Sequence, residues 1–338
     1  MVSATRVTIG GLADRLGLSK ASVSYALNGQ PGVSDDTRRR VLDLAEELGW
    51  HPSSSARALS RARSDAIGIV LRRDPGLLGT EPYYMSLLAG VEAELAESGQ
   101  SLLLRMVGTS NGQDLAAYRR WSAERRVDGV MLFDIVVGDP RPALLDELGL
   151  AFVLHGNDES TAPGRVLLYD AFGDARVLVD HLHALGHRRI LHIQGPQEFE
   201  HEQERAAAIA RFAAEHGMQA ASEPSDYSME AGERIAAAHA EDPGLTAIVT
   251  SNDLLALGAQ AALSRRSRDD IALVSWDDSL ICRLGSRPLT ALARFPEEQV
   301  RRATRMLLDE LSRVATLTRT GRPSELIVRS TSVRAQQA

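Results

Sequence analysis

The chain has 338 residues, a length that predicts two or three folding units rather than one small module. Hydrophobic residues make up 44% and charged residues 25%, as in ordinary globular proteins, and the formal net charge is −7. A single cysteine, Cys282, excludes an intramolecular disulfide and a cysteine-bound metal cluster, and it favours a reducing compartment. No apolar run approaches the roughly 18 residues of a transmembrane helix. Because the first residues also lack the apolar run of a signal peptide, we expect a cytoplasmic protein.

The charge is distributed unevenly along the chain. Residues 1–63 carry nine basic and six acidic side chains, a net charge of +3. The remaining residues carry 29 basic and 39 acidic side chains, a net charge of −10. A basic segment joined to an acidic body indicates that only the first segment meets a polyanion.

The first fifty residues contain the signals of three short helices. Thr8, Ser19 and Ser34 are N-cap residues, and each precedes apolar side chains at helical spacing. The predicted helices cover residues 9–16, residues 20–27, and a third stretch between Ser34 and Gly49. Two short helices joined by a tight turn and braced by a third form a helix-turn-helix, which lays its second helix in the major groove of DNA.

The second of these helices has a face suited to DNA. Val23, Ala26 and Leu27 point inward, which leaves an outer face of Lys20, Ala21, Ser24, Tyr25 and Asn28. Short polar side chains allow close approach to a phosphate backbone through hydroxyls and amides. The alternative is a plain three-helix bundle with a solvated polar face.

From Asp65 onward, short aliphatic strands alternate with amphipathic helices. The first predicted set of strands covers residues 67–71, 101–106, 130–133 and 151–154, and the second covers 165–168, 190–193, 247–250 and 271–275. Helices are predicted between most of them, for example over 84–97, 171–185 and 254–263. This alternation indicates parallel sheets with helices on both faces, arranged as two lobes, and ligands bind such sheets beyond the carboxyl ends of the strands.

Motifs of enzyme chemistry are missing from the sequence. It has no phosphate-binding glycine loop, no nucleophile elbow and no metal-binding helix pair. His181, His183 and His187 lie close together in the sequence, but His181 and His183 are two apart on a helix and face different directions. We therefore expect no catalytic residues, no metal and no cofactor.

Several motifs together resemble the LacI/GalR repressor family, and the resemblance extends over nearly the whole chain. In the first part they are Val7-Thr8-Ile9, Ala13, Gly17-Leu18-Ser19, Val23-Ser24, Leu27-Asn28, Val33-Ser34, Thr37-Arg38 and Leu48-Gly49-Trp50-His51-Pro52. In the body they are Leu185 to Ile190, Thr246-Ala247-Ile248, Asn252 to Gly258, Trp276-Asp277-Asp278 and Pro288-Leu289-Thr290.

The resemblance implies which residues of the first part contact DNA. Lys20, Ala21 and Tyr25 match the base-reading positions, where lysine can donate to guanine O6 and N7 and alanine can contact a thymine methyl. The positions that match phosphate-contacting residues are Thr8, Ser19, Ser24, Asn28, Ser34 and Thr37. The sequence departs from the family at Gly10-Gly11, and each glycine should weaken the first helix by roughly 1 kcal/mol.

The segment Pro52 to Ser60 matches the family's hinge helix. Proline at a helix start and the spacing of Ala56 and Leu59 allow two helical turns, which are too short to be stable alone in water. The resemblance implies that this helix forms on DNA, with Leu59 as an apolar wedge in the minor groove. By composition alone the segment would be a flexible linker.

The body resembles a periplasmic sugar-binding protein, and this implies an effector pocket between the lobes. The matching positions are Arg205, Asn252, Asp277 and Tyr227, with Trp276, His155 and Tyr84 as further candidates. The alternative for Asn252 is a helix cap, and the alternative for Trp276 is a core residue. His155 stands where many relatives have Asp or Gly, so its role is open.

The expected fold is an all-α helix-turn-helix head joined by a hinge helix to an α/β, two-lobed core with parallel sheets, similar to periplasmic binding proteins. The expected parts are the DNA-binding domain 1–50, the hinge 51–64 and the core 65–338, with lobe one at about 65–165 and 294–321 and lobe two at about 166–293 and 322–338. The expected function is a transcriptional regulator, a repressor, that binds a palindromic operator as a homodimer under the control of a small-molecule effector, a sugar. A family member with a non-sugar effector or none, a solute-binding protein and a sugar-processing enzyme are the alternatives.

Overall fold

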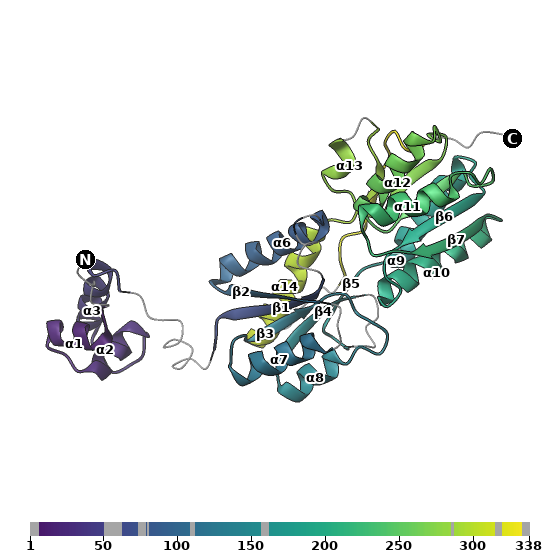
Figure 1. The fold of residues 1–338 in the computed structure, drawn as a ribbon. Coiled ribbons are helices and arrows are strands. Elements are labelled where there is room, and N and C mark those ends of the chain that lie inside the picture. Colours follow the sequence, from purple (N-terminus) through teal and green to yellow (C-terminus); the bar gives the residue numbers. More distant parts are fainter. Residues whose placement is uncertain are drawn as a thin grey trace. The chain divides into compact units, whose positions relative to one another are not determined.

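The computed structural model describes residues 7–50, 63–73, 79, 81–108, 112–156, 162–284, 287–314 and 320–332. The chain divides into two compact units, residues 1–64 and residues 65–338. Figure 1 shows that the first unit is helical and that the second contains two sheets flanked by helices. Among the described residues, no helix has the length and apolar character needed to span a bilayer.

The described residues of the first unit form three helices, α1 (Ile9–Leu16), α2 (Lys20–Leu27) and α3 (Asp35–Glu47). The three predicted N-caps are confirmed: the hydroxyls of Thr8, Ser19 and Ser34 accept hydrogen bonds from the backbone amides three residues later, at 3.0–3.2 Å. The core of this unit is a small aliphatic cluster, formed by Leu12, Ala13, Val23, Ala26, Val41 and Ala45. The predicted helix-turn-helix head is thus present.

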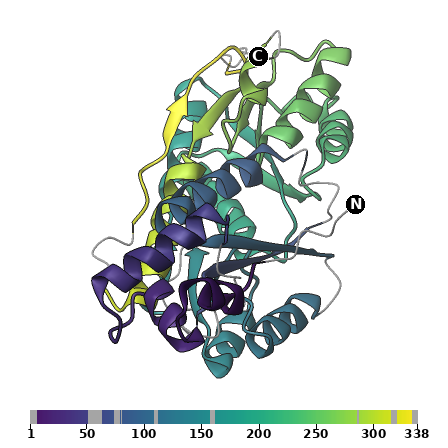
Figure 2. The same ribbon diagram turned by 90° about the vertical axis from the view of Figure 1, so that its left-hand side faces the viewer.

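The first lobe of the second unit contains a five-stranded parallel sheet in the order β2-β1-β3-β4-β5. The strands are β1 (Ala66–Arg72), β2 (Ser101–Val107), β3 (Gly129–Leu132), β4 (Ala151–Gly156) and β5 (Val166–Leu168). Helices α6 (Pro82–Ser98) and α14 (Pro296–Ser312) cover one face, and α7 (Gln113–Ala123) and α8 (Arg141–Leu148) cover the other. Figures 1 and 2 show α14 running along α6, although residues 99–295 separate the two helices in the sequence.

The second lobe contains a six-stranded sheet in the order β11-β10-β9-β8-β6-β7. Its strands are β6 (Arg189–Gln194), β7 (Gln219–Pro224), β8 (Ala247–Thr250), β9 (Ala272–Ser275), β10 (Thr290–Ala293) and β11 (Glu325–Ile327), of which only β11 is antiparallel to its neighbour. Helices α9 (Ala171–Ala184) and α10 (Glu200–Glu215) pack on one face, and α11 (Met229–His239) and α12 (Asp253–Arg265) on the other. The short α13 (Ile281–Leu284) follows β9.

One strand assignment from the sequence is wrong. The strand over 165–168 was placed in the second lobe, but β5 pairs with β4 through Leu154 and Val166 and closes the first sheet. The chain crosses to the second lobe only after β5. An aliphatic strand carries no local mark of the sheet that it joins, because both sheets are parallel and buried on both faces.

Three strands of the second sheet were not predicted. β7 has the sequence Gln-Ala-Ala-Ser-Glu-Pro and lies at the sheet edge with most of its residues exposed or half-buried, so it lacks an apolar run. β10 has four residues, as do the predicted β8 and β9, so its length does not explain why it was missed, whereas β11 has only three residues. A strand as short as β11 is defined by its neighbours in the sheet rather than by local pattern.

Helices α11 and α12 approach each other closely at two glycines. A Cβ atom on Gly258 would collide with the carbonyl oxygen of Met229, and one on Gly232 would collide with the carbonyl oxygen of Leu255. Both obstacles are backbone atoms, which cannot move aside as a side chain could. Two glycines on facing helices therefore set the distance between α11 and α12.

We predict that Gly258→Ala lowers the free energy of unfolding of the second unit by about 2 kcal/mol, because overpacking outweighs the helix propensity gained. Urea denaturation followed by circular dichroism measures this change. Gly79→Ala is the matched control, since no atom lies within 4 Å of its Cβ position, and it should leave the unfolding midpoint unchanged. A Gly258→Ala protein as stable as the control would contradict the prediction.

Candidate functional site

The outer face of α2 is the first candidate site. Lys20, Ala21 and Tyr25 are exposed, and Tyr25 keeps 43% of its surface in solvent although it is a large aromatic residue. Val23 and Ala26 are buried beneath them. The structure thus brings the three expected base-reading residues together on one accessible face of a helix.

The expected phosphate contacts surround this face. Thr8, Ser19 and Ser34 lie at the N-termini of three helices, where free backbone amides and the positive end of the helix dipole favour an anion. Thr37 lies within hydrogen-bond distance of Ser34, with 2.9 Å between their hydroxyl oxygens. The Asn28 amide donates to the carbonyl oxygen of Ser24 at 2.9 Å, which fixes its orientation. Leu59, the expected minor-groove wedge, lies outside the described residues.

The second candidate site is a cleft between the two lobes of the core. Six of the seven expected effector residues line it: Tyr84, His155, Arg205, Tyr227, Asn252 and Asp277. Most of the lining residues follow the carboxyl ends of strands, as in other open α/β sheets. Trp276 is not among the lining residues. It is fully buried in the second lobe, and the Arg205 guanidinium lies 4.8 Å from its ring centroid, so the alternative of a core residue is confirmed.

Aromatic side chains are concentrated in this cleft. Only 4% of the chain is aromatic and only six residues are tyrosines, yet Tyr83, Tyr84, Tyr169 and Tyr227 all line the cleft. The His155 ring adds to them, 5.2 Å from Tyr169. The space left between the lining residues is about 50 Å³, which holds no more than a few water molecules.

Each arginine that lines the cleft is paired with a carboxylate. Arg73 contacts Asp134 at 3.3 Å, Arg205 donates to Glu202 at 2.7 Å, and the Arg294 Nε donates to Asp277 at 2.9 Å. Burial would raise the pKa of Asp134, but the charge of Arg73 and further cationic and hydrogen-bonding neighbours outweigh it and hold that pKa below its usual value. The cationic charge of the arginines is therefore balanced within the cleft.

Glu202 organises the second-lobe side of the cleft. It is fully buried and accepts hydrogen bonds from the Gly195 amide at 2.7 Å, from Ser251 Oγ at 2.6 Å and from the Tyr227 hydroxyl at 3.0 Å, besides the one from Arg205. Burial alone would raise its pKa, but the charge of Arg205, the neighbouring His201 and His192, and the hydrogen bond from Ser251 lower it to about 2. Glu202 was not identified from the sequence, although its place one turn before Arg205 on the same helix was a usable signal.

Asn252 serves the fold as well as the cleft. Its side-chain oxygen accepts from the Leu255 amide at 2.8 Å, which confirms the alternative of a helix cap, and its amide group donates to the Tyr227 carbonyl at 3.2 Å. Tyr227 itself has a positive φ of 68°, and a Cβ atom on Gly195 would collide with its ring. Such backbone strain persists only where neighbours hold it, and it is common at ligand sites.

Arg73 connects the two lobes across the cleft. It follows β1 of the first lobe, and its guanidinium carbon lies 4.7 Å from the ring centroid of Phe199 and 5.3 Å from that of Tyr227, both from the second lobe. Nearby, the Glu200 amide donates to the carbonyl oxygen of Ile135 at 2.9 Å. These contacts hold the lobes together on this side. Arg73 was missed because nothing in its local sequence shows which side chains face it.

Three buried histidines make the stability of the core dependent on pH. Burial lowers the pKa of His155, His192 and His201 to about 4, from an ordinary value of 6.5. In the described part of the chain, no group of three His, Cys, Asp or Glu residues is arranged to hold a metal ion. These histidines are neutral hydrogen-bonding groups of the fold.

We predict that the free energy of unfolding falls as the pH is lowered from 7 to 5. The unfolded chain takes up protons below pH 6.5, whereas the folded chain keeps these histidines neutral until about pH 4, so each contributes a slope of about 1.4 kcal/mol per pH unit. Glu81 and Asp253 oppose the histidines, because burial raises the pKa of these carboxyls to about 7 and about 6. Since both remain in the variant, His192→Asn should lower the slope by about 1.4 kcal/mol per pH unit. Urea denaturation at several pH values measures it, and a wild-type stability that is flat across this range would refute the prediction.

Both units of the chain match known protein families. Residues 8–53 match the model of bacterial regulatory proteins of the lacI family, and residues 179–332 match the periplasmic binding protein-like domain. The transcriptional regulator AglR of Rhizobium meliloti is 32% identical over 287 residues, which cover 81% of this chain and 78% of AglR. A solved complex of the transcriptional regulator CelR with cellobiose has a TM-score of 0.70 at 26% identity, covering 96% of this chain and 100% of CelR.

A further solved structure shows the same fold. The lac repressor dimer bound to operator and an anti-inducer has a TM-score of 0.85 at 23% identity, covering 97% of this chain and 100% of that one. The structure has a helix-turn-helix head and a core with two sheets, and one relative is 32% identical to the chain. These findings all indicate the same family. The chain belongs to the LacI family of transcriptional regulators.

Proposed function

We propose that this regulator binds a palindromic operator as a homodimer and that a neutral sugar in the cleft controls its affinity for DNA. The observation that carries the sugar assignment is the composition of the cleft, in which four tyrosines accompany three arginine–carboxylate pairs. An effector that is not a sugar, and the absence of any effector, are the competing possibilities.

The charge balance of the cleft favours a neutral ligand with many hydroxyl groups. An anionic effector would need arginines without carboxylate partners, whereas Arg73, Arg205 and Arg294 are each paired. Paired arginines and carboxylates still offer donors and acceptors side by side, which suits sugar hydroxyls. The tyrosine rings offer flat apolar faces to the C–H groups of a sugar ring. The binding of cellobiose by CelR supports the same class of ligand.

The narrowness of the cleft supports coupling to DNA. About 50 Å³ cannot accommodate a sugar ring, so the ligand requires the lobes to separate and the contacts of Arg73 with Phe199 and Tyr227 to change. A ligand that favours one spacing of the lobes shifts the population toward that spacing. If operator DNA favours the other spacing, sugar and DNA oppose each other, and the coupling is reciprocal.

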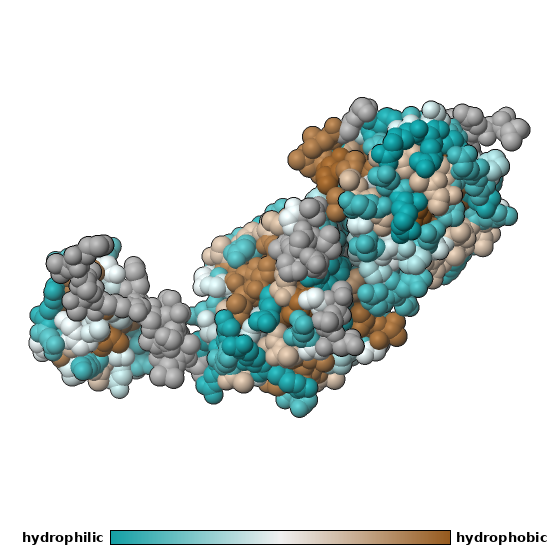
Figure 3. Space-filling model, viewed as in Figure 1, coloured by the Kyte–Doolittle hydropathy of each residue, from teal (hydrophilic) through white to brown (hydrophobic). Residues whose placement is uncertain are grey.

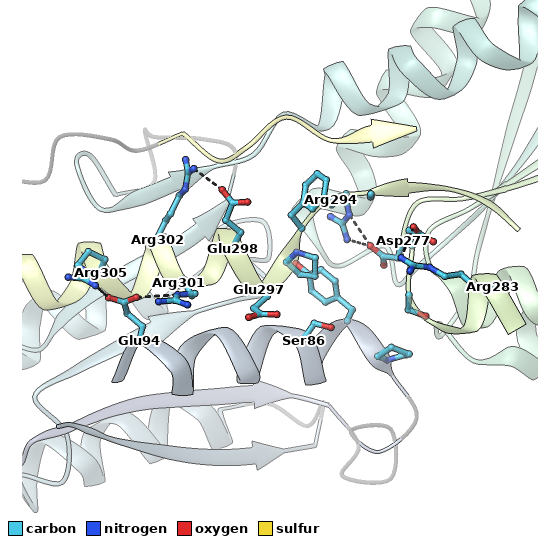
Figure 4. Close-up of a pocket in the computed structure, with 17 residues that line it drawn as sticks. Ser86, Glu94, Asp277, Arg283, Arg294, Glu297, Glu298, Arg301, Arg302 and Arg305 are labelled. Atoms are coloured by element: carbon cyan, nitrogen blue, oxygen red, sulfur yellow. Dashed lines mark hydrogen bonds and ion pairs between the residues drawn. The ribbon is translucent and has the colours of Figure 1, made fainter. Parts of the chain in front are cut away.

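An exposed apolar surface supports a dimer. Leu280 and Leu284, which flank and end α13, are 65% and 73% exposed, and Met85 on α6 is 51% exposed. Figure 3 shows a hydrophobic patch at α13. Residues of α6 and α13, such as Ser86 and Arg283, also line one pocket of about 750 Å³ (Figure 4). Apolar patches of this kind mark interfaces, and one helix-turn-helix reads only a half-site, so a two-fold dimer matches a palindrome.

We predict that neutral disaccharides, with cellobiose tested first, bind the protein and that Tyr169→Ala weakens binding about tenfold through the loss of ring contact. Isothermal titration calorimetry measures the affinity, and Tyr169→Phe, which retains the ring, is the control. Tight binding of sugar phosphates together with no binding of neutral sugars would exclude the proposed ligand class.

We predict that Leu280→Asp combined with Leu284→Asp produces a folded monomer, because charged groups cannot be buried unpaired in an apolar interface. Sedimentation velocity gives the oligomeric state, and titration of a palindromic operator at fixed salt gives the DNA affinity, which should fall to that of a half-site. Val177→Asp is the control, since Val177 is 39% exposed on α9, which packs on the opposite face of the second sheet from α12 and α13. A double variant that still sediments as a dimer would place the interface elsewhere.

A further inference from the structure

Gly10, in the first turn of α1, lies against the side chain of Lys20, the first residue of α2. A Cβ atom on Gly10 would lie 3.3 Å from Lys20 Cε and 3.8 Å from Lys20 Nζ. The first distance is shorter than the optimal separation of two carbon atoms, about 3.5–4.0 Å. The lysine side chain therefore occupies space that any residue other than glycine would partly fill.

The backbone of α1 does not explain the glycine. Gly10 is not among the residues with positive φ, and both it and Gly11 lie within a regular helix, where alanine is favoured over glycine. The neighbouring glycine differs in its surroundings: a Cβ atom on Gly11 would meet only Thr8 Oγ1, at an ordinary 3.8 Å. Of these two glycines, only Gly10 borders a side chain of the DNA-reading face.

Tyr25, the other long side chain of the DNA-reading face, also lies beside a glycine. A Cβ atom on Gly32 would lie 3.3 Å from Cδ2 of Tyr25. Lys20 and Tyr25 are exposed and would otherwise be free to adopt several rotamers. Each lies beside a glycine from another segment, which leaves room for it there. Gly32 has a φ of 115°, which itself favours glycine, whereas Gly10 does not have a positive φ.

We propose that Gly10 is a specificity-determining residue of the DNA-reading head, which acts by setting the direction of Lys20. Without a Cβ at position 10, the lysine methylenes lie across the first turn of α1, and this path fixes where the ammonium group meets a base edge. A methyl group at position 10 would displace the lysine rather than the helix, because Lys20 Cε belongs to the flexible end of a long side chain. The inference rests on the proposed reading of bases by Lys20.

The test compares Gly10→Ala with Gly11→Ala in the full-length protein. Each variant selects binding sequences from duplexes with two symmetric randomised half-sites, and thermal unfolding is measured in parallel. Both alanines should leave the head as stable as, or more stable than, the wild type. Gly10→Ala should reduce the base preference at one symmetric position by about three- to tenfold, whereas Gly11→Ala should retain the wild-type preference.

Two lysine variants separate this inference from the proposed function. Lys20→Ala should reduce the base preference at the same operator position. Adding Gly10→Ala to Lys20→Ala should have no further effect, because Gly10 acts only through the lysine side chain. If Lys20→Ala relaxes a position and Gly10→Ala does not, the role of Gly10 is refuted while base reading by Lys20 stands. The role of Gly10 is also refuted if Gly10→Ala changes the base preference by the same amount when Lys20 is replaced by alanine. If Lys20→Ala changes no base preference, base reading by Lys20 fails, and the role of Gly10 fails with it.

Discussion

The buried carboxylate of Glu202 is the interaction on which the second-lobe side of the cleft depends. Its partners come from the segments that follow β6, β7 and β8 and from its own helix, so one charge joins four parts of the lobe. A buried charge of this kind is tolerated only while its partners remain, and removing one of them typically costs about 3–5 kcal/mol. The positions of Arg205, Tyr227 and Ser251 are consequently interdependent.

The first lobe meets this framework through Arg73. The arginine is compensated by Asp134 of its own lobe, and its guanidinium packs on aromatic rings of the other lobe. If the lobes separate as proposed, Arg73 loses its cation–π contacts with the second lobe but keeps its ion pair with Asp134, because both residues belong to the first lobe. Its charge therefore stays paired.

The head and the core differ in how far apart in the sequence the residues of their sites lie. Its reading face is formed by side chains on two turns of one helix, and the caps, the turn and the small aliphatic cluster beneath are all local in sequence. The cleft is formed by residues from Arg73 to Arg294, which reach one place only because parallel strands end at the same edge of a sheet. The proposed DNA-reading face therefore depends on local structure, and the proposed effector site depends on the whole core.

This difference explains how far the sequence alone could lead. Thr8, Ser19 and Ser34 were identified as caps because a capping hydroxyl acts on an amide three residues away. The resemblance to a known family pointed to Arg205, Tyr227 and Asp277, which the fold brings together in the cleft. It could not show that Trp276 lies beneath Arg205 instead of lining the cleft, since both positions suit a tryptophan at a strand end.

The helices of the head, the alternation of strands and helices, and the family could all be inferred from local patterns of side chains along the chain. Three-dimensional packing was needed to show that β5 closes the first sheet, that Glu202 neutralises Arg205, that Arg73 reaches the second lobe and that Gly10 borders Lys20. The placement of β5 and the pairing of Glu202 with Arg205 are choices among equivalent partners. The other two are contacts between separate elements or lobes. Such contacts depend on packing geometry, which local sequence patterns do not encode.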